Sequence, residues 1–134
     1  NFIAHYPFWL AETATEDERT PTSGVGYTLV NSGNAPTRCK IEITTASNGA
    51  NDSIRIDNST NSTFFEYHGV VVGLDTLEVD NRYDTDDFEV LNDGVDDIIN
   101  YEGDFIVLEP DNNNIIFTGN VATTVKITYR NCWY

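Results

Sequence analysis

The stretch Arg38-Cys39-Lys40-Ile41-Glu42-Ile43-Thr44 decides the fold class of this protein. Its apolar residues at positions 39, 41 and 43 alternate with charged residues at positions 38, 40 and 42. Because successive side chains of a β-strand point to opposite faces, this run predicts a strand with one face in a core and one in water. Such one-sided strands are typical of antiparallel sheets.

The same two-residue period recurs along most of the chain. Further candidate strands are Gly24–Val30, Ser53–Asp57, Phe64–Tyr67, Thr76–Asp80, Asp87–Val90, Phe105–Leu108, Asn114–Phe117 and Val125–Arg130. No window of a dozen residues repeats apolar positions at helical spacing, and residues 11–19 are expected to form a polar loop rather than a turn of helix. The pattern predicts an all-β fold, an antiparallel β-sandwich, with residues 1–134 as a single domain.

Clusters of Asn, Asp and Gly separate the candidate strands. These residue types tolerate positive φ and form local side-chain hydrogen bonds, so they mark turns. The clusters are Asn31–Asn34, Ser47–Asp52, Asn92–Gly94 and Asp111–Asn114. The triplet Asn92-Asp93-Gly94 in particular predicts a tight hairpin.

The chain has 134 residues and a net charge of −15, from 7 Lys and Arg and 22 Asp and Glu. This balance argues against nucleic acid and anionic membranes as partners, because clustered cations bind both. Wholly apolar runs are only a few residues long, as in Phe105–Leu108, so no membrane insertion is expected. The chain has no Met and no signal-like start, and we expect it to be a piece of a longer protein.

The chain contains two cysteines, Cys39 and Cys132. Two cysteines are too few for a disulfide framework or a four-thiolate metal site. Cys39 lies in an alternating run and Cys132 follows another, so buried free thiols are favoured over a bridge.

Acidic residues dominate the middle of the chain, where 14 lie between Asp75 and Asp111 against one basic residue, Arg82. Oxygen ligands for calcium, the one candidate cofactor, are offered by Asp80, Asp84, Asp86 and Asp87. The stretch lacks the order of an EF-hand loop, and a solvated acidic face is the favoured interpretation. A glycosidase with paired carboxylates is a third interpretation. Its chemistry requires a set distance between the two carboxyl groups, which a sequence does not give.

Histidine is scarce, with only His5 and His68 in the chain. A Gly-x-Ser-x-Gly nucleophile elbow does not occur, nor do CxxC and HExxH motifs. We therefore expect ordinary polar or packing roles for both histidines and no enzymatic activity.

Aromatic residues gather at both ends of the chain. Trp9 near the start and Trp133 near the end are candidates for a glycan-binding platform, because an exposed indole ring stacks on the C–H groups of a sugar. The alternative is that the terminal aromatics pack into the core or against a neighbouring domain.

Short motifs in a fixed order extend over nearly the whole chain. They are Pro7-Phe8-Trp9, Asn31-Ser32-Gly33-Asn34-Ala35-Pro36, Ile41-Glu42-Ile43, Leu77–Asn81, Phe88–Gly94, Asp104–Asn112 and Val125–Trp133. In this order they resemble the C-terminal domain of siphophage distal tail proteins. Asp111 stands where that family usually has Gly after Pro110, and residues 50–72 match least well.

The resemblance implies a galectin-like or carbohydrate-module-like jelly roll doing structural work in a virion. In that family the domain lies at the tip of a long non-contractile tail, and the intact protein forms a homo-oligomeric ring through another domain. Expected partners are the tail tube, the tail-tip hub and a receptor-binding protein, after assembly in the bacterial cytoplasm. The isolated domain is expected to be a monomer. The alternative function is a carbohydrate-binding module for host-surface or cell-wall polysaccharide.

Overall fold

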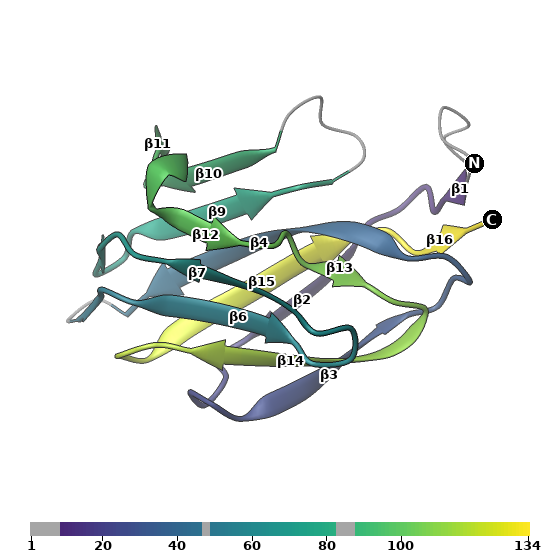
Figure 1. Cartoon of the computed structure of the whole chain (residues 1–134), viewed down its shortest axis with the longest axis horizontal. Coiled ribbons are helices and arrows are strands. Elements are labelled where there is room, and N and C mark those ends of the chain that lie inside the picture. The colour runs from purple at the N-terminus through teal and green to yellow at the C-terminus, as the bar shows by residue number, and fades with distance from the viewer. Residues whose placement is uncertain (1–8, 47–48, 83–87) are drawn as a thin grey trace.

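The structure, a computed structural model, describes residues 9–46, 49–82 and 88–134. Two antiparallel sheets face each other and form a β-sandwich (Figure 1). The first sheet has the order β11-β10-β9-β4-β15-β2, with β13 paired to one end of β4. Its strands are β2 (Thr15–Arg19), β4 (Thr37–Thr45), β9 (Thr76–Asp80), β10 (Glu89–Asn92), β11 (Val95–Asp96), β13 (Val107–Leu108) and β15 (Thr123–Tyr129).

The second sheet has the order β12-β7-β6-β14-β3. Its strands are β3 (Gly26–Asn31), β6 (Ile54–Asn58), β7 (Thr63–Tyr67), β12 (Tyr101–Gly103) and β14 (Asp111–Thr118). Two short ribbons complete the fold: β1 (Trp9–Leu10) with β16 (Cys132–Trp133), and β5 (Ala50–Asn51) with β8 (Val71–Val72). Among the described residues the one helical element is the 3₁₀ turn η1 (Ile98–Asn100), and no helix is long and apolar enough to cross a membrane.

The core lies between the two sheets and follows the predicted alternation. In β4 the buried Ile41 and Ile43 lie opposite Ile127 and Val125 of β15. The second sheet contributes Ile54 and Ile56 of β6 with other inward side chains to the same cluster. Both faces are therefore apolar inside and polar outside, which confirms the predicted antiparallel β-sandwich.

Both cysteines and the Asn92–Gly94 hairpin agree with the sequence-based expectations. Cys39 and Cys132 are free and buried, and burial raises the pKa of the Cys39 thiol to about 12. Asn92 lies opposite Val95, and the two residues between them have positive φ, 51° at Asp93 and 81° at Gly94. Two successive residues with positive φ are the hallmark of a type I′ hairpin.

Two expectations were wrong. Thr15–Arg19, predicted as part of a polar loop, is strand β2, which pairs with β15 at the edge of the first sheet. An edge strand with no inward apolar residue shows no alternation in its sequence. The pairing of β2 with β15 includes an ion pair between the Lys126 ammonium and the Glu16 carboxylate at 3.0 Å. The cluster Asp111–Asn114, predicted as a turn, forms the first half of β14.

Candidate functional site

Four exposed apolar residues lie in the segment in which the chain crosses from the first sheet to the second. We call this surface the apolar corner and define it by Phe88, Val95, Ile98 and Ile99, which are 51%, 67%, 41% and 88% exposed. In Figure 1 it lies where β10 and β11 approach η1 and β12. A shallow groove of about 190 Å³ runs along it, lined by Phe88, Glu89, Val90, Leu91, Asp96 and Ile98.

Hydrogen bonds beneath the apolar corner hold η1 against the end of both sheets. The Tyr67 hydroxyl donates to the Asp97 carboxylate and accepts from the Asn92 side-chain amide at 3.0 Å. Asn100 donates to the same carboxylate at 2.9 Å, and the Asp97 amide donates to the Val90 carbonyl. The bonds from Tyr67 and Asn100 lower the pKa of Asp97, whereas burial and the Asp97 bond raise the pKa of Tyr67 to about 12. The corner is thus a fixed surface rather than a loose loop.

A row of aromatic rings connects the core to the apolar corner. The buried Phe65 ring stacks on Tyr101 at 5.1 Å between centroids, and Tyr101 stacks on Phe105 at 5.0 Å. Phe105 in turn contacts the exposed Phe88 at 4.5 Å. Aromatic pairs at these distances are attractive, so the row anchors Phe88 at the surface.

The segment that carries the apolar corner is acidic. Residues 88–104 contain no Lys or Arg, and their acidic residues are Glu89, Asp93, Asp96, Asp97, Glu102 and Asp104. The sequence offered one signal for this surface that the strand pattern did not use. Ile98-Ile99 is an apolar pair inside a polar, acidic segment and fits no alternation.

The two tryptophans predicted as a glycan platform are brought together by the β1–β16 ribbon. Trp9 lies directly opposite Trp133, and residues opposite each other on paired strands share a face. Trp9 is 46% exposed. The ribbon is tied to the sandwich by the Ala35 amide, which donates to the Cys132 carbonyl at 3.0 Å.

The residues predicted to bind calcium are placed only in part. Asp80 is at the end of β9, and its carboxylate accepts two hydrogen bonds from the Arg82 guanidinium at 2.9 and 3.0 Å. Burial tends to raise the pKa of Asp80, but the bonds from Arg82 outweigh it and lower that pKa. Asp84, Asp86 and Asp87 lie outside the described residues. Asp80 therefore already has a cationic partner, and the calcium site stays a prediction.

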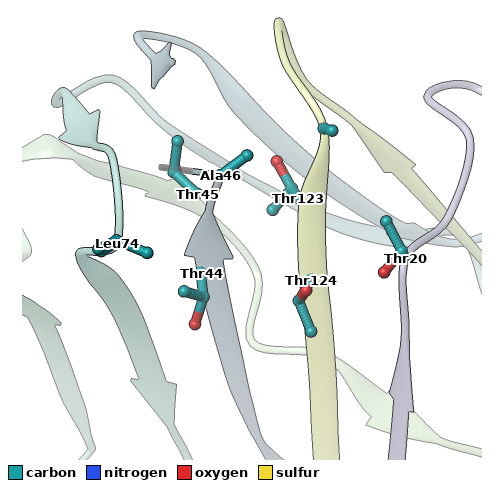
Figure 2. A pocket seen from close by; sticks show the side chains of 8 residues that line it. Thr20, Thr44, Thr45, Ala46, Leu74, Thr123 and Thr124 are labelled. Carbon is teal, nitrogen blue, oxygen red and sulfur yellow. The ribbon is translucent and has the colours of Figure 1, made fainter. Parts of the chain in front are cut away.

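A second shallow pocket, of about 200 Å³, lies at the threonine-rich end of the first sheet. Figure 2 shows its wall, with Thr44 and Thr45 on β4, Thr123 and Thr124 on β15, and Thr20 and Leu74 at the sides. Its lining residues offer only methyl and hydroxyl groups and peptide backbone. Without a carboxylate, imidazole or thiol, these residues supply no general acid or base.

Comparisons with known proteins agree with the fold. Residues 32–133 match the model of the siphovirus-type tail component, C-terminal domain. The chain is also similar to the SPP1 Dit protein, whose crystal structure is described as a paradigm of the hub adsorption apparatus in phages that infect Gram-positive bacteria. That similarity has a TM-score of 0.65 at 13% identity and covers 92% of this chain but 49% of SPP1 Dit. No curated protein matches the chain.

The family match includes most of the elements that carried the sequence resemblance, but Pro7-Phe8-Trp9 precedes it. It extends from the Asn31–Pro36 turn to Trp133 and includes both sheets apart from β2 and β3. Asp111, where the family usually has Gly, has a φ of 71°, a left-handed conformation that favours Gly. The chain spans about half the length of SPP1 Dit. It belongs to the family of siphovirus-type tail components, as their C-terminal domain, and is a structural part of a phage virion.

Proposed function

We propose that this domain lies at the tip of a siphovirus tail and docks a neighbouring tail protein through the apolar corner. The family match and the shared fold with a hub protein of an adsorption apparatus support this location. In the proposal the intact protein forms a ring through parts outside this chain. The domain then presents the corner outward, to a receptor-binding or other tail-tip protein.

The observation that carries the proposal is the exposure of large apolar groups on a rigid support. Val95 and Ile99 are 67% and 88% exposed, although the Tyr67–Asp97 network fixes the backbone that bears them. Apolar side chains held in a fixed exposed cluster are typical of a surface that is buried in a complex. The neighbouring edge strands β11 and β12 offer unpaired backbone groups for strand addition by the partner.

Charge specifies the chemistry of the partner. Since residues 88–104 carry six carboxylates and no Lys or Arg, a second copy of this domain would be repelled. The fitting partner has an apolar centre flanked by Lys and Arg. Association through such a surface is expected to weaken as salt rises, because salt screens the charges at the rim.

Charged substitutions in the apolar corner test the docking proposal. The variants Val95→Asp and Ile99→Asp are expected to weaken binding to the partner tail protein of the same phage by about 30-fold or more. The physical reason is that docking would bury a carboxylate with no partner. The measurement is isothermal titration or size-exclusion chromatography with the purified tail proteins of that phage.

Val30→Asp is the matched control, since Val30 is also exposed, at 44%, but lies on β3 of the second sheet. It should bind as the unaltered domain does. Unchanged binding by both corner variants, with correct folding, would rule out this surface as the docking site.

Glycan binding is a second candidate function, favoured by the pairing of the two tryptophans. Because Trp9 and Trp133 are the only tryptophans of the chain, intrinsic tryptophan fluorescence reports on this ribbon alone. If the ribbon binds sugar, titration with cell-wall polysaccharide gives a saturable fluorescence change that Trp9→Ala abolishes and Phe88→Ala leaves intact. A flat titration would remove this function and leave the docking proposal standing.

A further inference from the structure

Three side chains with metal-binding groups meet on the outer face of the second sheet. Glu66 of β7 lies directly opposite Glu102 of β12. His68 follows β7, and its backbone amide donates to the Asn100 carbonyl at 2.9 Å, which extends the pairing by one residue. Because Glu66 and His68 are two residues apart on extended backbone, their side chains leave the same face.

The separations of the three groups suit one small cation. The His68 Nε2 atom lies 3.0 Å from Glu102 Oε2 and 3.6 Å from Glu66 Oε2. One ligand atom from each residue lies within 4.8 Å of the other two. A tetrahedral zinc ion with bonds of about 2.0 Å holds its ligand atoms about 3.3 Å apart. The two distances from His68 lie on either side of that value. The third distance, between the carboxylate oxygens of Glu66 and Glu102, can be adjusted by rotation of the exposed Glu102 side chain.

We propose that Glu66, His68 and Glu102 bind a zinc ion, with water in the fourth position. An imidazole with two carboxylates is a donor set for zinc and similar transition metals. Calcium prefers six to eight oxygen ligands, so an imidazole-containing set of three selects against it. This site is separate from the acidic stretch in which the sequence predicted calcium.

Electrostatics and neighbouring hydrogen bonds support the site. Two carboxylates directly opposite each other on adjacent strands repel, and a dication between them removes the repulsion. The Arg55 guanidinium donates to Glu66 Oε1 at 2.7 Å and to Asp57 at 2.9 and 3.0 Å. The Arg55 contact orients the Glu66 carboxylate so that Oε2 faces His68. Hydrogen-bond partners of metal ligands commonly orient them in this way.

Zinc at this position would fasten an edge of the sandwich. β12 has only three residues, pairs with β7 on one side and ends the second sheet on the other. A metal bonded to both strands resists their separation, because binding to the folded state alone stabilises it. The proposal is independent of the docking function.

The test is zinc binding by the whole chain, followed by thermal unfolding and by the visible absorption of cobalt as a spectroscopic substitute. At about pH 7.5 zinc is expected to raise the melting temperature by several degrees, and cobalt to give the absorption bands of a tetrahedral site. His68→Ala should weaken binding by about tenfold or more.

Two controls make the test specific. His5→Ala removes the other histidine of the chain and should bind zinc as before, and magnesium should leave the melting temperature unchanged. Glu102→Gln serves as a second site variant, because Glu102 is 73% exposed and its replacement does not disturb the core. No zinc effect on the unaltered chain, or zinc binding by His68→Ala and Glu102→Gln as tight as that of the unaltered chain, would mean that the cluster is an ion pair only.

Discussion

Replacing Asn113 with leucine is expected to lower the free energy of unfolding by about 3 to 5 kcal/mol. Asn113 is fully buried in β14. Its side-chain oxygen accepts hydrogen bonds from the Glu109 amide at 2.8 Å and from Asn58 at 2.9 Å. Its side-chain nitrogen donates to the carbonyls of Glu109 and Asp111. Leucine fills the space but leaves these buried groups without partners.

Thermal unfolding followed by circular dichroism measures this effect. At about 4 °C per kcal/mol for a domain of this size, the melting temperature is expected to fall by roughly 10 to 20 °C. Asn112→Leu is the matched control, because Asn112 is the exposed neighbour on the same strand, and its replacement should change stability little. Equal melting temperatures for the two variants would contradict the role assigned to Asn113.

Replacing Gly33 with alanine is expected to destabilise the domain by about 2 to 4 kcal/mol and to displace the β1–β16 ribbon. A Cβ at position 33 would overlap the Cys132 carbonyl and lie 2.6 Å from the Cys132 nitrogen. These are backbone atoms, so a side-chain rotation does not relieve the clash. The displacement would also break the bonds from the Ser32 and Ala35 amides to Asn131 and Cys132.

Tryptophan emission measures the displacement directly, since both tryptophans lie in the ribbon. The expected result is a shift of the emission maximum to longer wavelength together with a lower melting temperature. Gly24→Ala is the control, because Gly24 has a φ of 81° but nothing within 4 Å of the added Cβ. It should cost about 1 kcal/mol and leave the emission unchanged. An unaltered spectrum for Gly33→Ala would show that the turn does not hold the ribbon.

Strands with one buried face were predictable from sequence, and those without one were not. β4 and β9 agree with the predicted Arg38–Thr44 and Thr76–Asp80 because each alternates between core and water. β2 has the sequence Thr-Glu-Asp-Glu-Arg and becomes a strand only by pairing with β15. The alternation of apolar and polar residues indicates which side chains are buried. An edge strand that buries no apolar side chain therefore shows no alternation.

Buried asparagines account for the misplaced start of β14. Asn113 continues the inward positions of Ile115 and Phe117, but an asparagine cluster indicates a turn unless its partners are known. Asn31 and Asn58 likewise extend the inward rows of β3 and β6 and hold backbone groups at strand ends. An asparagine in register with the inward residues at the end of an alternating run is therefore a sequence signal for a buried asparagine that binds backbone groups at a strand end.

The candidate sites depend on register between distant segments. The sequence indicated Trp9 and Trp133 separately, and pairing of β1 with β16 makes them neighbours. Glu66 and Glu102 had no signal at all, because only the β7–β12 register sets them opposite each other.

By itself the sequence determined the all-β class, the inward and outward faces of the main strands, the free buried cysteines and the family. The class, the strand faces and the cysteines follow from composition and from a period of two residues, which act over a few positions, whereas the family was indicated by a resemblance in the order of short motifs. The tertiary structure alone decided which edge strands form, where the apolar corner is exposed, and which histidine lies between two carboxylates. The physical reason is that strand pairing joins residues far apart in the chain. The free energy of that pairing depends on both strands, and a short stretch of sequence contains only one of them.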